Sequence, residues 1–158
     1  MSSFTEKLSI TQISSKPRRW RVDKSFRFYI GKKDSHLWVD ILEGFICDGG
    51  SMPRCVWWLD SPIGFGAASY FLHDGLYQAW VGPRALCDIT MLEGLQVLGM
   101  GWTRRSLIYN QVWMWGWKAY NDKTHAGILE ARQFVKASFP MMPLPELPLL
   151  TPPAIAGG

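Results

Sequence analysis

The sequence contains few cysteines. Only Cys47, Cys55 and Cys87 occur among 158 residues, and no two of them have the C-x-x-C spacing. An odd and small number of cysteines excludes a disulfide framework, and the missing spacing excludes a structural zinc site of the usual type. We therefore expect reduced thiols, mostly buried as small apolar groups.

Long apolar runs are also missing. The richest segment, Ile108 to Trp117, is interrupted by Asn110 and Gln111 and is shorter than the roughly 18 residues of a membrane-spanning helix. The first 15 residues carry Glu6 and Lys7 where a secretory signal would be apolar. The sequence thus predicts neither a transmembrane segment nor a signal peptide.

The chain is rich in apolar and aromatic residues, with 47% hydrophobic residues and nine tryptophans. At this length a single core can bury roughly two-thirds of the surface of the unfolded chain. We expect a polar and basic arm over residues 1–19, one globular domain over 20–139, and an extended tail over 140–158, where six prolines occur in 19 residues. Residues 1–16 are expected to be loosely ordered.

Positive charge is concentrated at the N-terminal end. Residues 1–40 hold nine basic and four acidic side chains, a balance of +5, and the remaining residues hold eight and nine, a balance of −1. A basic segment with interleaved aromatics can contact nucleic acid or an anionic lipid surface. A solvated basic face is the more frequent outcome, so we expect no nucleic acid partner.

Periodicity predicts an α+β fold in which a small antiparallel β-meander precedes three to four helices. Apolar residues alternate over 20–30 and again over 37–42, and a short third strand covers 45–47. Helical spacing of apolar residues predicts helices over 65–81, 83–98, 103–120 and 126–137. In the third helix, Tyr109, Val112, Trp113 and Trp117 form an aromatic stripe that we assign to the core.

The candidate chemistry lies between residues 44 and 88. A glycine loop contains Asp48, Gly49 and Gly50 and precedes a helix that bears His73, Asp74 and Tyr77, and the next helix presents Asp88. If these helices are antiparallel, His73 and Asp88 differ in height by about 4–5 Å, so their side chains can meet. A neutral imidazole can then accept a proton from water while the carboxylate fixes its tautomer.

A purely structural role remains open for the same residues. A buried histidine bonded to an aspartate can simply satisfy two polar groups, and the glycine loop can be only a turn between a strand and a helix. The order of loop, His-Asp pair and aspartate within a segment poor in charge keeps the functional interpretation equally open, because a buried carboxylate is costly unless it is paired or metal-bound.

The motif resembles that of the domain of unknown function 1353, a small family common in tailed bacteriophages and prophages. Its residues here are Gly44-Phe45, Asp48 to Arg54, Trp57, His73 to Tyr77, Arg84 and Asp88. The resemblance covers roughly residues 29–117. It implies a phage or prophage origin, and a location in the bacterial host cytoplasm or in the virion.

A more remote likeness connects the same pattern with secreted phospholipase A2 and its viral capsid counterparts. That resemblance implies catalytic roles for His73 as base and Asp88 as its partner. It also implies a calcium ion held by Asp74 and by carbonyls of Gly49 and Gly50, and we add Asp48 to these ligands and assign Tyr77 to substrate binding.

These features lead to a first hypothesis, a phage protein with a calcium-dependent, phospholipase-like hydrolase site and a phospholipid or membrane surface as partner. The alternative is a virion or accessory binding protein whose His/Asp cluster is structural and whose proline-rich tail docks on virion proteins. An HD-type phosphohydrolase is disfavoured, because His36 and His125 lie outside the helices that such a site needs.

Overall fold

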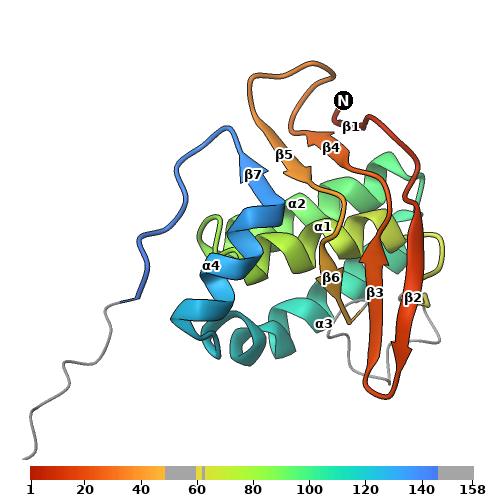
Figure 1. Ribbon diagram of the computed structural model, residues 1–158. Helices are drawn as coiled ribbons and strands as arrows, with labels where there is room; N and C mark the ends of the chain where they lie inside the picture. The colour runs from red at the N-terminus through yellow and green to blue at the C-terminus, as the bar shows by residue number, and fades with distance from the viewer. Residues whose placement is uncertain (49–59, 62, 146–158) are drawn as a thin grey trace, which may run out of the picture.

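The computed structural model describes residues 1–48, 60–61 and 63–145. Four helices are present in them: α1 (Ala67–Gln78), α2 (Arg84–Val97), α3 (Trp102–Asn121) and α4 (His125–Phe134). The strands are β1 (Ser3–Phe4), β2 (Ile10–Ser15), β3 (Arg18–Val22), β4 (Phe26–Tyr29), β5 (Trp38–Ile41), β6 (Ile46–Cys47) and β7 (Val135–Ala137). Strands precede helices along most of the chain, which confirms the predicted α+β class (Figure 1).

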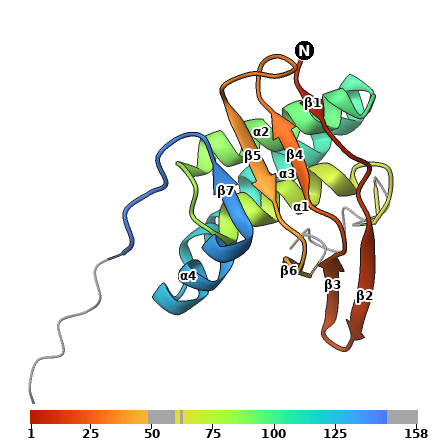
Figure 2. The ribbon, with the colours of Figure 1, turned by 45° about the horizontal axis from the view of Figure 1, so that its top comes forward.

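The strands form two antiparallel sheets. One has the order β1-β4-β5-β7 and the other the order β2-β3-β6. Figure 2 shows β4, β5 and β7 side by side, with the β2–β3 hairpin at one end of the molecule. Alternate side chains of β4 and β5, such as Phe28 and Val39, are completely buried against the helices, as the period-two pattern requires.

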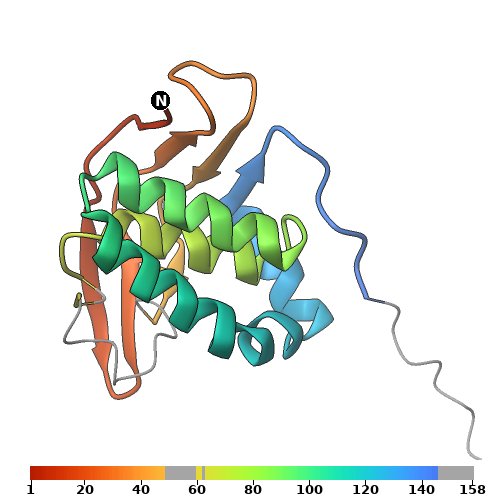
Figure 3. The same ribbon diagram turned by 180° about the vertical axis from the view of Figure 1, so that it is seen from behind.

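Helix α1 is the centre of the molecule. Every residue from Ala67 to Tyr77 is buried, because α1 contacts α2, α3 and α4 as well as β5 and β6. Figure 3 shows α2 and α3 side by side in front of α1, on the side away from the sheet of β4 and β5. The polar side chains of α1 must therefore find partners inside the protein.

Close approach on both sides fixes the position of α1. A Cβ added at Gly75 would lie 2.5 Å from Cδ1 of Ile41 in β5, and a Cβ added at Gly94 of α2 would lie 2.6 Å from Oγ of Ser69. The Ser69 hydroxyl also donates a hydrogen bond of 2.6 Å to the carbonyl of Met91. These contacts set the register in which α1 faces α2.

The predicted helices agree with α1, α2 and α3 to within a few residues, and the predicted pairing of 20–30 with 37–42 is present as β4–β5. The alternating run over 20–30 nevertheless forms two strands. Strand β3 ends at Val22, β4 begins at Phe26, and the two strands belong to different sheets. Strand β6 pairs with β3 instead of continuing the meander. The predicted fourth helix ends at Phe134, and its last residues form β7 on the edge of β5.

The prediction of a loosely ordered arm over residues 1–16 is wrong, because this segment contains β1 and β2. Ser2 is 3% exposed and its hydroxyl bonds to the Glu93 carboxylate of α2. The nine basic side chains in residues 1–40 include three that form ion pairs: Arg27 with Asp40 at 2.6 Å, Arg21 with Asp23, and Lys24 with Glu6.

The first residues of the predicted tail lie against the domain. The amide of Met142 donates to the carbonyl of Trp80, and the carbonyl of Met142 accepts from Arg132 of α4. Residues 146–158 are outside the described part of the chain, so docking of the tail on a virion protein stays a prediction.

The assignment of the aromatic stripe of α3 to the protein core is largely wrong. Val112 is buried, but Trp113 and Trp117 are 62% and 65% exposed. The core of the molecule is already filled by α1 and the sheets, so α3 is an outer helix with one buried side. Within the described ranges, no helix combines the length and the apolar character needed to cross a bilayer.

Candidate functional site

The antiparallel packing of α1 and α2 brings together the two residues on which the sequence hypothesis depends. His73 Nε2 lies 2.9 Å from Oδ1 of Asp88, and both residues are buried. One turn further along α1, the Tyr77 hydroxyl donates a hydrogen bond of 2.6 Å to the same oxygen. The predicted contact between His73 and Asp88 is therefore confirmed.

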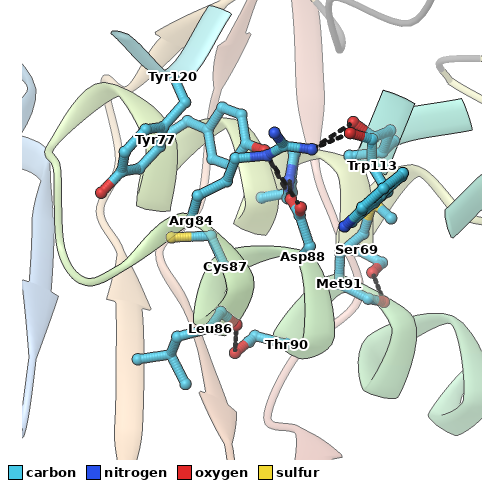
Figure 4. A network of polar contacts seen from close by, with 12 residues as sticks. Ser69, Tyr77, Arg84, Leu86, Cys87, Asp88, Thr90, Met91, Trp113 and Tyr120 are labelled. Atoms are coloured by element: carbon cyan, nitrogen blue, oxygen red, sulfur yellow. Dashed lines mark hydrogen bonds and ion pairs between the residues drawn. The ribbon is translucent and has the colours of Figure 1, made fainter. Parts of the chain in front are cut away.

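The second oxygen of Asp88 faces a cation on its own helix. Arg84 Nε lies 3.3 Å from Asp88 Oδ2, one helical turn away. The same guanidinium donates to the main-chain carbonyls of Val112 and Trp113 in α3. Figure 4 shows Tyr77 and Arg84 both directed at Asp88, with Arg84 continuing to Trp113. Asp88 thus links α1, α2 and α3.

Helix α3 also encloses Tyr77. A Cβ added at Gly116 would lie 2.8 Å from the Tyr77 hydroxyl oxygen, so only glycine leaves room for this hydroxyl. The ring of Tyr77 packs edge-on against Tyr120, with 5.2 Å between ring centroids, and is tilted against the imidazole of His73, with 4.0 Å between centroids. The tyrosine is 4% exposed, and its hydroxyl orients Asp88.

The surroundings favour a neutral imidazole beside a charged carboxylate. Burial lowers the pKa of His73, and the hydrogen bond and charge of Asp88 offset this only in part. Burial alone would raise the pKa of Asp88, but the hydrogen bonds from His73 and Tyr77 outweigh it and the pKa falls below its usual value. Near pH 7 the Nε2–H of His73 then donates to Asp88, which leaves the lone pair on Nδ1.

Asp74 follows His73 but faces a different neighbour. Asp74 is 8% exposed, and both it and Asp48 interact electrostatically with the ammonium of Lys123, just beyond α3. Burial lowers the pKa of Lys123, and the charges of Asp74, Asp48 and Asp122 oppose this effect. Asp74 and Asp48 therefore both lie within electrostatic range of Lys123.

The structure describes only two of the four calcium ligands predicted from the sequence, Asp48 and Asp74. Gly49 and Gly50 lie outside the described residues. In the described ranges, no group of three or more histidine, cysteine or acidic side chains has the geometry of a metal site. A calcium site at Asp48, Asp74 and the two glycine carbonyls stays a prediction.

An open hollow of about 530 Å³ lies beside this region. It runs between the β2–β3 hairpin and α4, and its wall includes Asp48 and Gln78, the residue that follows Tyr77. Arg18, Arg19 and Glu130 also contribute to its wall. Neither His73 nor Asp88 is among the described residues that line it.

A third buried carboxylate, that of Asp60, stabilises the beginning of α1. Asp60 is 5% exposed and accepts hydrogen bonds from the amide of Gly66 at 2.8 Å and the hydroxyl of Tyr70 at 2.9 Å. Arg104 of α3 pairs with its other oxygen at 3.2 Å. Asp60 thus ties the N-terminus of α1 to α3, at the opposite end of α1 from Tyr77.

Sequence reasoning assigned no role to three residues of the His73 cluster. Arg84 could have been found, because it precedes Asp88 by four residues and this spacing pairs opposite charges on a helix. Gly116 and Lys123 gave no such signal, since their closeness to Tyr77 and Asp74 depends on how α3 crosses α1. The two buried cysteines of the described part, Cys47 and Cys87, are free thiols, as expected, and Cys55 lies outside it.

The fold and the site together define a small α+β protein with a buried histidine, aspartate and tyrosine cluster between two antiparallel helices, braced by an arginine to a third. The family model described as protein of unknown function (DUF1353) matches residues 20–112. The chain belongs to this family, and the match includes His73, Tyr77, Arg84 and Asp88. Comparison with curated proteins and with solved structures gave no match.

Proposed function

We propose that the chain is a phage or prophage protein with a hydrolase site of the phospholipase A2 type, in which His73 is the general base and Asp88 orients it. The observation that carries this proposal is the use of Nε2 of a neutral His73 for the contact with Asp88, because it leaves Nδ1 as the proton acceptor. The order along the chain also supports the proposal. His73 is followed by Asp74 and Tyr77, and the partner Asp88 lies on an antiparallel helix, which is the pattern on which the resemblance to phospholipase A2 depends.

The proposed reaction is the attack of water on an ester carbonyl. Nδ1 of His73 accepts one proton from the water as its oxygen forms a bond to the carbonyl carbon. The resulting imidazolium is stabilised by the negative charge of Asp88, which Tyr77 holds in place. Collapse of the tetrahedral intermediate breaks the ester bond, and the imidazolium returns the proton to the leaving alkoxide.

The acidic neighbours suit a calcium ion as electrophile. Asp74 and Asp48 would supply carboxylate oxygens, and the carbonyls of Gly49 and Gly50 would complete the set. When bound, the ion would polarise the ester carbonyl and stabilise its developing negative charge. Lys123 contributes positive charge beside the same carboxylates, so it would limit their affinity for a cation.

The test is release of fatty acid from phospholipid vesicles in the presence of Ca²⁺. We expect His73→Gln to lower the rate by roughly 100-fold or more, as for the loss of a general base. The matched control is His36→Gln, the same change at an exposed loop histidine, which should leave the rate unchanged. Absence of hydrolysis by the wild type over a range of phospholipids and divalent cations would contradict the proposal.

A second candidate, a non-enzymatic binding protein, is favoured by the contacts through which Asp88 connects three helices. Its contacts with His73, Tyr77 and Arg84 join three helices, and the aspartate is 1% exposed, as in a structural ion-pair network. This candidate requires that His73→Gln and Asp88→Asn lower stability while binding to a virion or accessory partner persists below the unfolding temperature. Calcium-dependent hydrolysis that is lost in a stably folded His73→Gln protein would exclude it.

A further inference from the structure

The C-terminal half of α3 exposes more apolar surface than an ordinary outer helix. Trp113, Met114, Trp115 and Trp117 are between 58% and 65% exposed within five consecutive positions. Single exposed apolar side chains are common, but a contiguous group of this size marks an interaction surface. Three of these side chains, Trp113, Met114 and Trp117, lie on one side of the helix, and we call them the α3 patch.

The α3 patch lies on one side of its helix. At about 100° per residue, the three side chains span roughly 100° of the circumference, the usual width of an apolar stripe that packs against another surface. The described core does not cover this stripe, because the opposite side of α3, with Ile108 and Val112, faces inward and is buried.

The inner side of the same segment contacts the candidate site. Gly116 adjoins the Tyr77 hydroxyl, and the carbonyl of Trp113 accepts from Arg84, which pairs with Asp88. An object bound to the α3 patch is therefore separated from the His73 cluster by the thickness of one helix, about 10 Å.

The charged side chains of α3 itself are all basic. Helix α3 contains Arg104, Arg105 and Lys118 and no aspartate or glutamate; Arg104 pairs with Asp60 near the start of the helix, and Lys118 adjoins Trp117 in the α3 patch. A two-fold interface through the patch would bring Lys118 close to its own copy, which is unfavourable. An anionic surface is the complementary occupant.

We propose that the α3 patch binds the interface of an anionic phospholipid bilayer, with α3 lying in the plane of the membrane surface. Tryptophan is the side chain most suited to the boundary between headgroups and acyl chains, since its ring is amphipathic. A helix with tryptophan and methionine outward and basic residues beside them has the composition of an interfacial helix. The link to lipid hydrolysis rests on the proposed function, whereas the binding itself rests on the exposed side chains of α3.

The test is co-sedimentation of the full chain with vesicles of phosphatidylcholine and phosphatidylglycerol, compared with vesicles of phosphatidylcholine alone. We expect tighter binding to the anionic vesicles, weakened by salt. Replacement of the α3 patch by serine (Trp113→Ser, Met114→Ser and Trp117→Ser together) should weaken binding about tenfold or more, because three apolar side chains no longer enter the interface. Serine at these exposed positions leaves the core intact.

The matched control is Ile13→Ser. Ile13 is 44% exposed in strand β2, so the change removes an exposed apolar side chain that lies outside α3. This variant should bind vesicles as the wild type does. In a separate measurement on the wild type, brominated lipid should quench tryptophan fluorescence, which does not depend on the folding of any variant.

Three results would overturn the inference: no binding of the wild type to anionic vesicles, equal binding of the patch variant, or a solution dimer that the patch variant abolishes. Capture of a defined virion protein by the α3 patch in place of vesicles would also count against it. His73→Gln must retain vesicle binding. If vesicles bind and no lipid is hydrolysed, the proposed function fails while the membrane inference stands.

Discussion

Replacement of Asp88 by asparagine is the sharpest test of the cluster between α1, α2 and α3. The substitution keeps the size of the side chain and removes its charge. The asparagine oxygen can still accept from His73 and Tyr77, but the amide nitrogen is a donor and cannot replace the second carboxylate oxygen that faces Arg84. Arg84 then keeps its positive charge beside a donor.

The expected loss follows from the contacts of Asp88. Breaking a buried ion pair by removing one partner costs about 3–5 kcal/mol when the remaining charge is fully buried. The Arg84 side chain is 20% exposed and has the carbonyls of Val112 and Trp113 as further partners, so the lower end applies. We expect a loss of about 3 kcal/mol in the free energy of unfolding, or roughly 6–12 °C in melting temperature.

The measurement is urea denaturation together with a thermal scan. The control is Asp34→Asn, the same chemical change at an exposed residue with φ of 57°, a conformation that asparagine adopts readily. Tyr77→Phe and the double variant complete a thermodynamic cycle, in which the two changes should not add, because both alter the contacts of the Asp88 side chain. An Asp88→Asn protein within about 0.5 kcal/mol of the wild type would refute the network.

Two further predictions concern the residues around Asp88. Gly116→Ala should lower the free energy of unfolding by about 1–3 kcal/mol in denaturant titrations, because the added methyl group overlaps the Tyr77 hydroxyl. The control is Gly101→Ala at the start of the same helix, where the added methyl group meets open space, and it should change the free energy by less than about 1 kcal/mol. Equal effects of the two changes would contradict the packing of Gly116 against Tyr77. Because folding lowers the pKa of His73, this residue contributes stability that is fully present above its unfolded pKa of about 6.5 and is lost as the pH falls through the folded pKa. His73→Gln should therefore flatten the dependence of the free energy of unfolding on pH, measured from pH 7 downwards. An unchanged slope would show that His73 is not buried in its neutral form.

Local sequence patterns were sufficient for the helices and for the contact that defines the site. The spacing of apolar residues predicted α1 and α2, and the short turn at Gly82-Pro83 made them antiparallel neighbours. Counting along two antiparallel helices was then enough to bring His73 and Asp88 together, because both the rise per residue and the loop length are local quantities.

The pairing of strands and the surroundings of α3 could not be obtained in the same way. Alternation over residues 20–30 shows which side chains face inward, but it does not determine which sheet each half of the segment joins. The same limit applies to the α3 tryptophans, since helical spacing identifies a stripe and does not say what covers it. Sequence alone would place Trp113 and Trp117 in the core, which α1 already fills.

The sequence by itself determined the α+β class, the positions of the main helices and the pair His73 and Asp88, because these depend on periodicity and on short connections. Only the tertiary structure decided that Arg84 and Gly116 complete the cluster and that the aromatic side of α3 faces outward. Both outcomes depend on how α3 crosses α1 and α2, and such a crossing is set by the packing of side chains distant in sequence.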